Sequence, residues 1–427
     1  MREMKDSGIE WIGQIPKGWE LRRAKTLFTQ RNSKGNEIEV LLSPTQKYGV
    51  VPQSQLEGVV QVKEDTNLQM FKTVHKGDFV ISLRSFQGGF EYSLYEGVCS
   101  PAYQVFYPTS PICDTYYRYL FKSRSFISKM NNLTVGIREG KNIQYVDFAN
   151  SQIQVPPLAE QERIAAFLDA ECAKIDAVLE KTRASIEEYK KLKQAVITQA
   201  VTKGIRGDRP MKDSGIEWIG EIPAEWNKDK VIRVFSVIGS GTTPKSSDEN
   251  LFDGNTPWIQ SGDINGENLF VTKNCVSNSA IESYSALRVY QAPYLVVAMY
   301  GASVGNLSLS MIDACVNQAC CVLKKPTINL KFSFYIFKAV KDYLARKAVG
   351  GGQPNISQET IKQLWLPIPS ADEQIEISNY LDEKCRSVDA LIAKKQQYLT
   401  EIENYKKSLI YEYVTGKKEV KTSVLVD

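Results

Sequence analysis

The chain has 427 residues, of which 43% are hydrophobic and 24% charged, as in proteins that bury sizeable apolar cores. At this length we expect about three or four compact pieces rather than one domain. The net charge of +4 is mildly basic, so composition neither requires nor excludes a polyanionic partner. Residues 1–9 are polar and no apolar run reaches 18 residues, so we expect no signal peptide, no membrane span and a reducing, cytoplasmic location in a bacterium or archaeon.

The segment near the N-terminus returns in the middle of the chain. Residues 4–13, MKDSGIEWIG, recur letter for letter as residues 211–220, which is 207 positions later (211 − 4). The likeness continues through a shared Ile-Pro to Trp19 and Trp226. Ten consecutive identities indicate an internal duplication.

Residues 20–150 form the first insert between shared segments. Short β-branched runs at 49–51, 59–62 and 79–81 alternate with Gly, Asn, Asp and Pro clusters, which predicts short strands. A helix is expected from Thr115 to Met130, and the single histidine, His75, is interpreted as a surface loop residue.

A long amphipathic helix is predicted from Ala159 onward. Pro156-Pro157 precedes it and Gly204 ends it. Apolar or small residues recur every three or four positions, which is the pattern of one helix face. These residues are Ile164, Leu168, Cys172, Ile175, Leu179, Thr182, Ile186, Tyr189, Leu192 and Val196.

The start of this helix is also repeated. Glu160-Gln161 and Leu168-Asp169 return as Glu373-Gln374 and Leu381-Asp382, which is 213 positions later (373 − 160), and Asn142-Ile143 returns as Asn355-Ile356 at the same offset. The second helix is expected from Ala371, between Pro369 and Gly416, with an interruption at Lys395. Its stripe is Ile377, Leu381, Cys385, Val388, Ile392, Leu399, Ile402, Tyr405, Leu409 and Tyr413.

The second insert, residues 227–365, has diverged from the first but keeps a faint common skeleton. Residues 80–83 lead to a loop ending at Gly89 and then to Cys99, and residues 295–298 lead to a loop ending at Gly305 and then to Cys315. A strand is expected at 294–297 and a helix from Leu330 to Ala348. We favour the interpretation that the two inserts share one fold and have two specificities. The alternative is that a duplicated structural domain simply diverged, but the flanking segments stayed alike while the inserts did not.

The expected fold class is α+β: two mixed β-rich domains joined by two long antiparallel helices in a pseudo-two-fold tandem duplicate. Two rods in one chain can bury each other's stripes, although each rod packing on its own insert remains an alternative. The expected domains are a first β-rich domain with the N-terminal repeat (1–157), a first long helix (158–205), a second β-rich domain with the repeated segment (206–369), a second long helix (370–416) and a C-terminal tail (417–427).

Several enzyme signatures are missing from the sequence. A single histidine does not allow a His-paired triad in both halves, and residues 239–246 fail as a phosphate loop because Pro244 stands where glycine is needed. No Cys-x-x-Cys occurs, and Cys315, Cys320 and Cys321 are more typical of a core than of a metal site. We therefore expect a non-catalytic protein with no metal site of its own.

The inserts carry residues suited to DNA in glycine-rich or turn-like settings. Arginine can bind guanine edges and Gln or Asn adenine edges, whereas Lys, Thr and Ser suit phosphates. The candidates in the first insert are Lys47, Tyr48, Arg84, Gln87, Arg138, Lys141 and Asn142. Those in the second are Thr242, Thr243, Lys245, Gln260, Tyr300, Asn317, Gln318, Gln353 and Asn355.

The layout resembles the specificity subunit of type I restriction–modification enzymes. The resemblance rests first on the repeated segments Ser7–Pro16 and Ser214–Pro223. It rests also on the start of the first long helix, Pro157–Asp169, with a weaker copy at 371–382, and on Gly241–Pro244 with Thr256–Ile259. It implies that each insert reads half of a split, asymmetric double-stranded DNA site, and that the helices set the spacing and dock two methyltransferase subunits. Restriction subunits would join them, and AdoMet, ATP and Mg²⁺ would belong to those other chains.

Two other functions stay open at this point. One is a coiled-coil adaptor with two binding arms and no nucleic-acid specificity, which would lack the steep salt dependence of a DNA reader. The other is a stand-alone nuclease or methyltransferase, which would act on DNA without partners.

Overall fold

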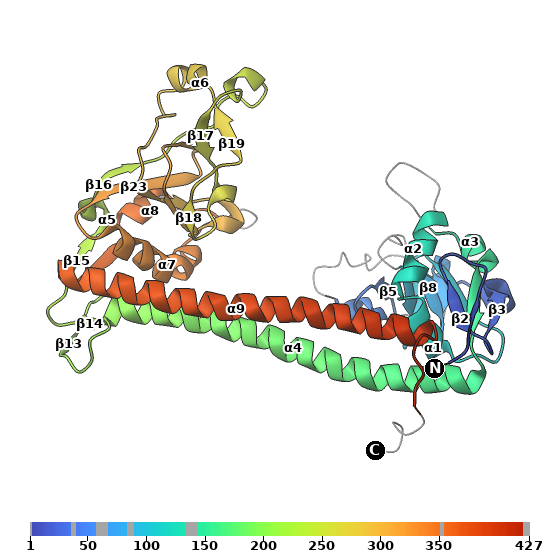
Figure 1. The fold of residues 1–427 in the computed structure, drawn as a ribbon. Coiled ribbons are helices and arrows are strands. Elements are labelled where there is room, and N and C mark those ends of the chain that lie inside the picture. The colour runs from blue at the N-terminus through green and yellow to red at the C-terminus, as the bar shows by residue number, and fades with distance from the viewer. Residues whose placement is uncertain are drawn as a thin grey trace. The chain divides into compact units, whose positions relative to one another are not determined.

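The structure is a computed structural model that describes residues 2–35, 40–56, 67–82, 89–133, 143–350 and 354–421. It divides into two compact units, Met1–Arg183 with Gln397–Asp427, and Ala184–Gln396. Each unit contains one β-rich domain and part of each of two long helices, α4 (Leu158–Lys203) and α9 (Ala371–Val414), as Figure 1 shows.

The first unit is built on a four-stranded antiparallel sheet with the strand order β4-β11-β8-β9. Smaller strand pairs flank this sheet. The strands are β1 (Met4–Asp6), β2 (Gln14–Pro16), β3 (Glu20–Arg23), β4 (Phe28–Arg31), β5 (Leu42–Thr45), β6 (Gly49–Pro52), β7 (Lys72–Val74), β8 (Phe79–Ile81), β9 (Phe90–Tyr92), β10 (Gly97–Cys99), β11 (Gln104–Pro108) and β12 (Gln152–Val155). The helices are α1 (Asp114–Leu120), α2 (Arg124–Leu133) and α3 (Tyr145–Asn150), with short 3-10 turns at Ala24–Thr26, Gln53–Gln55 and Leu68–Met70.

The second unit repeats this order in a five-stranded sheet, β16-β23-β20-β21-β18. Its strands are β13 (Met211–Asp213), β14 (Glu221–Pro223), β15 (Asn227–Lys230), β16 (Phe235–Gly239), β17 (Thr256–Ile259), β18 (Asn268–Leu269), β19 (Asn274–Val276), β20 (Tyr294–Ala298), β21 (Leu307–Ser310), β22 (Cys315–Val316), β23 (Cys320–Pro326) and β24 (Trp365–Ile368). The helices are α5 (Val231–Val234), α6 (Asn278–Ser283), α7 (Leu330–Arg346) and α8 (Gln358–Lys362), with 3-10 turns at Glu249–Leu251, Ser261–Asp263 and Gly301–Ser303.

The shared strand order explains the faint skeleton in the sequence. β4, β11, β8 and β9 correspond in order to β16, β23, β20 and β21, and only β18 joins its neighbour β21 in parallel. The predicted fold class, two mixed β-rich domains joined by two long helices, is confirmed.

Each insert enters and leaves its domain through one antiparallel strand pair. β3 pairs with β12 in the first unit, and β15 pairs with β24 in the second. β3 and β15 are the first residues of the two inserts, β12 lies just after the first insert, and β24 begins at the last residue of the second, so the two ends of an insert are held side by side. The interior of an insert can therefore change while its attachment to the rest of the unit stays the same.

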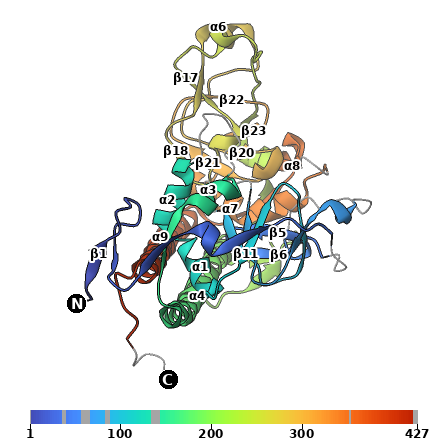
Figure 2. The same cartoon turned by 90° about the vertical axis from the view of Figure 1, so that its right-hand side faces the viewer.

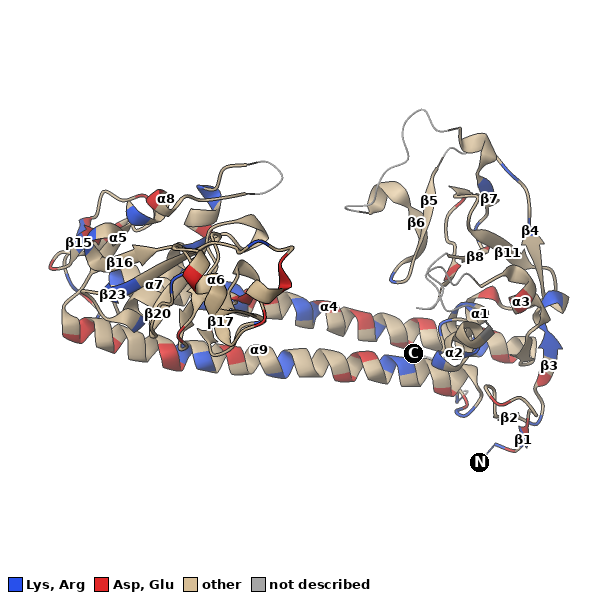
Figure 3. Cartoon of the chain, turned by 90° about the horizontal axis from the view of Figure 1, so that it is seen from above, with Lys and Arg blue, Asp and Glu red and all other residues tan. Residues whose placement is uncertain are grey.

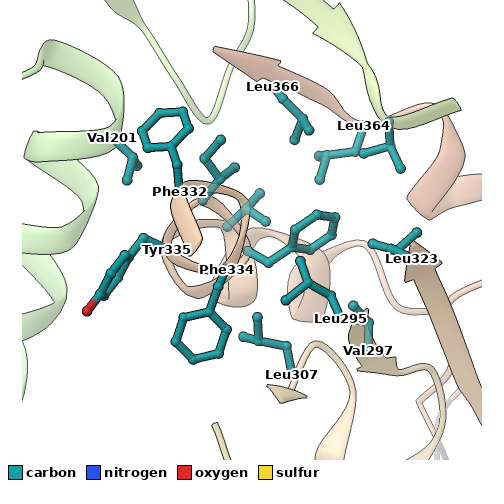
Figure 4. Packing of buried hydrophobic residues seen from close by; sticks show 14 of the residues in the cluster. Val201, Leu295, Val297, Leu307, Leu323, Phe332, Phe334, Tyr335, Leu364 and Leu366 are labelled. Carbon is teal, nitrogen blue, oxygen red and sulfur yellow. The ribbon is translucent and has the colours of Figure 1, made fainter. Parts of the chain in front are cut away.

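Helices cover one face of each sheet. In the first unit, the core packs Tyr117 of α1, Phe126 of α2 and Phe148 of α3 against strand residues Phe28 and Phe106. Figure 2 shows the ribbons of these three helices next to the strands of the unit. In the second unit, α7 fills the equivalent position. Figure 4 shows Phe332, Phe334 and Tyr335 of α7 among Leu295 of β20 and Val201 of α4.

The long helices begin and end where the sequence predicts. Prolines precede both starts, and the chain leaves them through Gly204 (φ +76°) and Gly416 (φ +70°), where the left-handed backbone favours glycine. Within each unit, the portions of α4 and α9 that it contains run antiparallel. Charged residues alternate with uncharged ones along both helices (Figure 3).

One interhelical ion pair occurs in both units. In the first unit, Lys406 Nζ lies 2.6 Å from Asp176 Oδ1, and in the second unit Lys193 Nζ lies 2.6 Å from Asp389 Oδ2. Lys193 and Lys406 are equivalent positions of the duplication, as are Asp176 and Asp389. The duplication therefore makes the same contact twice, with the roles of the two helices exchanged.

The apolar stripes of the long helices were expected to be buried either against the other helix or against the neighbouring domain, and both kinds of burial occur. Ile164 and Leu168 of α4 join the core of the first domain together with Leu409 of α9, and Ile377 and Leu381 of α9 join the core of the second. Lys395, the expected interruption, is partly buried, and its Nζ lies 5.6 Å from the centre of the Tyr189 ring.

Some expectations from the sequence were wrong. Leu192 and Tyr405 do not belong to a buried stripe, because they are 50% and 55% exposed. The helix expected from Thr115 to Met130 is two helices, because the chain turns between Leu120 and Arg124. The strand expected at 59–62 lies outside the described residues. The strands at 49–51, 79–81 and 294–297 and the helix from Leu330 are confirmed.

His75 and the clustered cysteines are placed as expected. His75 follows β7 with its side chain 44% exposed, and Cys315, Cys320 and Cys321 are fully buried. Among the described residues, no three His, Cys, Asp or Glu side chains gather as metal ligands, and no helix there is long and apolar enough to cross a membrane.

Candidate nucleic-acid interface

The described candidates of the first domain lie on one hairpin turn. Lys47 and Tyr48 connect β5 to β6, and the Tyr48 N–H donates to Thr45 Oγ1 at 3.0 Å. Tyr48 is 60% exposed, and Lys47 Nζ lies 4.8 Å from the centre of its ring. An exposed ring beside an ammonium suits a base and its phosphate. Arg84, Gln87, Arg138, Lys141 and Asn142 lie outside the described residues, so their placement stays a prediction.

Candidates that are distant in the second insert come together at one end of its sheet. Thr243 Oγ1 donates to Gln318 Oε1 at 2.6 Å, which joins the segment after β16 to the loop between β22 and β23. Gly241 makes this approach possible, because a Cβ there would lie 1.7 Å from the carbonyl oxygen of Val316. Thr242 belongs to the same segment, and the exposed Lys245 follows it, with its N–H donating to the Tyr284 hydroxyl.

Gln260 and Asn317 extend this cluster. The Asn317 N–H donates to the carbonyl of Ile259 at 3.0 Å, so Asn317 lies beside Gln260. Asn274 Nδ2 in turn donates to Gln260 Oε1 at 3.3 Å. Asn274 was not among the candidates from the sequence, because only the pairing of β19 with β17 brings it here.

Tyr300 and Asn355 lie next to the same cluster. They form an isolated antiparallel bridge, and the Gly301 N–H donates to the carbonyl of Pro354 at 2.9 Å. The Met299 N–H donates to the carbonyl of Ala319, which places Tyr300 near Gln318, just beyond the paired ends of β20 and β23. Tyr300 is 45% exposed. Gln353 lies outside the described residues.

The second domain therefore presents one polar surface built from six chain segments, five of them outside strands and one, at Asn274, the start of β19. We call it the amide cluster and define it as Thr243, Gln260, Asn274, Tyr300, Asn317, Gln318 and Asn355. Its amides, hydroxyls and exposed ring can donate to, accept from and stack on nucleobases.

The repeated residues have a different role, which is to attach each domain to the long helix that follows it. In the first unit, Trp19 Nε1 donates to Glu160 Oε2 at 3.0 Å, and Arg2 pairs with the same carboxylate. In the second unit, Trp226 Nε1 donates to Glu373 Oε2 at 2.9 Å, and Arg209 lies 2.6 Å from Glu373 Oε1. We call each set an Arg–Trp–Glu triad.

Two further repeated positions also attach each domain to the long helix that follows it. Gln161 accepts from the N–H of Cys113 before α1, and Gln374 accepts from the N–H of Asn329 before α7. Asp169 and Asp382 accept from the hydroxyls of Tyr119 and Tyr335, each at 2.6 Å. Burial and then this hydrogen bond raise the pKa of both tyrosines, so both stay protonated donors. The repeat signature is thus a set of anchoring contacts rather than a binding surface.

The most perturbed carboxylate lies within the first sheet. Glu91 on β9 is 1% exposed, and burial raises its pKa to about 7 although Lys122 Nζ lies 2.5 Å from its Oε1. This pair links β9 to the turn after α1.

Comparison with known proteins matches both halves of the chain to one family. The model of the type I restriction modification DNA specificity domain matches residues 16–188 and 223–404. The chain is 24% identical, over 435 residues and 96% of each sequence, to a Methanocaldococcus jannaschii protein named as the MjaX specificity subunit of a type I restriction enzyme. It is 26% identical over 297 residues, or 66% of each sequence, to the type I restriction enzyme MjaVIII specificity subunit of the same organism.

Solved structures show the same fold. A chain from a study of complex assembly and conformational transition of the type I R-M system superposes with a TM-score of 0.71 at 17% identity, over 95% of this chain and 99% of that chain. The HsdS subunit of Thermoanaerobacter tengcongensis gives a TM-score of 0.50 at 16% identity, over 95% and 98% of the two chains.

Proposed function

Since the chain belongs to the type I restriction–modification DNA specificity family, whose role is DNA sequence recognition, we propose that its two domains read the two different halves of one bipartite, asymmetric site on double-stranded DNA. The chain itself would be non-catalytic and would position methyltransferase and restriction subunits on that site.

The observation that carries this proposal is one sheet order with two different exposed surfaces. Both domains share the order of four strands. The second presents the amide cluster at one sheet end, whereas the described candidates of the first are a lysine and a tyrosine on a hairpin turn. Different donors and acceptors on one scaffold read different bases. Two diverged domains therefore favour two unlike half-sites.

The long helices suit a role as a spacer between half-sites. A helix of 46 residues, as in α4, is about 69 Å long at a rise of 1.5 Å per residue. The repeated ion pair and the Arg–Trp–Glu triads attach each domain to the helices in the same way. A fixed helix length would then keep the number of base pairs between the half-sites constant.

The outer surface of the helices supports docking of two identical partner molecules. Val178 and Leu192 on α4 are 39% and 50% exposed, and their equivalents Leu391 and Tyr405 on α9 are 43% and 55% exposed. The same apolar positions therefore occur twice on the outside of the helices, beyond those that the cores bury. We assign these repeated positions to contacts with two methyltransferase subunits, one for each copy of the repeat.

The chemistry of the complex would then belong to the partner chains. We assign AdoMet to the methyltransferase subunits, and ATP and Mg²⁺ to the restriction subunits. The compartment that we propose is the bacterial or archaeal cytoplasm, where the DNA is accessible.

Binding of labelled duplexes at several salt concentrations tests this function. The logarithm of the association constant should fall linearly with the logarithm of salt concentration, by about 0.9 for each phosphate neutralised. A duplex carrying the complete site should bind far more tightly than a duplex with either half scrambled. A chain that binds methyltransferase subunits but no duplex would be the adaptor instead, and turnover on DNA by the chain alone would make it an enzyme.

A further inference from the structure

A polar cleft of about 540 Å³ opens on the first domain. It lies between β4, β11 and α3, and three glutamines line it: Gln30 of β4, Gln104 of β11, and Gln144, which directly precedes α3. Lys25 lies at the same cleft and is exposed. None of these residues was a candidate from the sequence.

Gln104 holds the other two glutamines in one hydrogen-bonded chain. Its Oε1 accepts from the N–H of Tyr145 at 2.7 Å and from Gln30 Nε2 at 3.4 Å, and its Nε2 donates to Gln144 Oε1 at 2.8 Å. The Gln104 side chain is therefore bonded at both ends of its amide, and it fixes the direction of the Gln144 amide.

Gln144 is exposed and has hydrogen-bonding capacity to spare. Its contact with Gln104 uses one of the two lone pairs on Oε1. Within the part of the chain that the structure describes, its Nε2 has no partner and its side chain makes no capping bond to α3. One acceptor site and two N–H donors thus face solvent in a fixed orientation.

The equivalent residue of the second domain is used differently. The duplication places Ser357 opposite Gln144, because Asn142-Ile143 and Asn355-Ile356 directly precede them. The Ser357 hydroxyl caps α8 by accepting from the N–H of Thr360. That helix start lies next to Tyr300 and Asn355 of the amide cluster. The side chain at this position therefore caps a helix in the second domain, whereas in the first it faces solvent with unused hydrogen-bonding groups, as expected for a residue that distinguishes two half-sites.

We propose that Gln144, oriented by Gln104, reads an adenine in the half-site of the first domain. This inference rests on the proposed function. A fixed amide that offers both a donor and an acceptor matches the major-groove edge of adenine, where N7 accepts and the N6 amino group donates. Lys25 can contact a phosphate beside that base. Gln104 is a positioning residue and touches no base.

The experiment uses the full-length chain with its methyltransferase subunits. Methylated sequences in host DNA are mapped for the unaltered chain and for Gln144→Ala, and dissociation constants are then measured on duplexes substituted at each position of the first half-site. Discrimination at one adenine should fall roughly 5- to 150-fold in the variant, with the second half-site unchanged. The matched control is Gln152→Ala, an exposed amide on β12 of the same domain outside this cleft.

A modified base identifies the contact itself. Replacing that adenine with 7-deazaadenine removes N7, so the unaltered chain should lose affinity while Gln144→Ala should show no further loss. Gln104→Glu keeps the acceptor for the Tyr145 N–H but cannot donate to Gln144. This variant should partly lose discrimination at the same base position. Gln104→Asn should lose it too, because the shorter side chain cannot reach the Gln144 amide.

Three results would overturn the inference. A folded Gln144→Ala variant with unchanged base preferences would show that Gln144 reads nothing, and equal weakening on all sequences would make it a phosphate contact. Additive losses from the variant and 7-deazaadenine would place the base elsewhere. If the unaltered complex shows no sequence preference, the proposed function fails together with this inference.

Discussion

The two Arg–Trp–Glu triads allow a paired measurement within one chain. Glu373 is 2% exposed, accepts from Trp226 Nε1 at 2.9 Å and lies 2.6 Å from Arg209, whose side chain is 11% exposed. The variant Glu373→Gln keeps an acceptor for the indole but removes the charge opposite Arg209. Its matched counterpart is Glu160→Gln in the first unit.

The expected cost follows from how deeply each ion pair is buried. Leaving one member of a buried ion pair without its partner costs about 3–5 kcal/mol. Arg209 keeps a second, half-exposed carboxylate, Glu225, at 3.0 Å, so we expect the lower end, about 3 kcal/mol. In the first unit, the side chains of Arg2 and Glu160 are 23% and 12% exposed, so water can replace the lost partner and we expect about 1–2 kcal/mol.

Hydrogen exchange resolves the two units separately. Amide protection is compared in the first turns of α9 for Glu373→Gln and in the first turns of α4 for Glu160→Gln, because local opening reports the stability of each attachment. The larger loss should be at α9. If Glu160→Gln costs as much as Glu373→Gln, or if neither exceeds about 0.5 kcal/mol, burial of the triads does not govern these attachments.

Three further predictions concern other parts of the chain. Burial raises the pKa of Glu91 from 4.5 to about 7, so this carboxyl favours folding fully below pH 4.5 and loses that contribution as pH rises through about 7. Urea titrations of Glu91→Gln should therefore lack a stability decrease of about 3 kcal/mol between pH 5 and 8, and parallel profiles for the two proteins would contradict this. Gly241→Ala should destabilise the second unit by about 2–3 kcal/mol in denaturant, whereas Gly262→Ala, whose Cβ would meet no atom within 4 Å, should be neutral; equal effects would refute the close approach. Leu192→Lys with Tyr405→Lys should change stability by less than about 1 kcal/mol yet weaken methyltransferase-subunit binding at least about tenfold in calorimetry, and unchanged affinity would remove these positions from the docking surface.

The long helices and the central strands were predictable because their signals are local. Pro156-Pro157 and Gly204 bound α4, and the predicted limits agree with the helix to within a residue. The exposure of Leu192 was not predictable from spacing. A repeat of three and four residues marks a wide helix face, and pairing two helices buries only a strip of it.

The candidate site was only partly accessible from the sequence, because its contacts join distant residues. Thr243 meets Gln318 across 75 positions, and Gln30 meets Gln104 across 74. Thr243 was predicted as a candidate from its residue type and its place in a glycine-rich segment. Nothing local distinguishes Gln30, Gln104 or Gln144 from other surface amides, and only the pairing of β4 with β11 and the start of α3 brings them together.

If each domain reads its own half of the DNA site, exchange of one insert should change one half-site alone. The diverged residues between β3 and β12 are replaced by the corresponding insert of another family member, which leaves both paired strands in place. Methylated sequences are then mapped in cells carrying the chimaera. We expect a new first half-site, an unchanged second half-site and an unchanged spacing between them. A change in both half-sites, or in neither, would contradict this expectation.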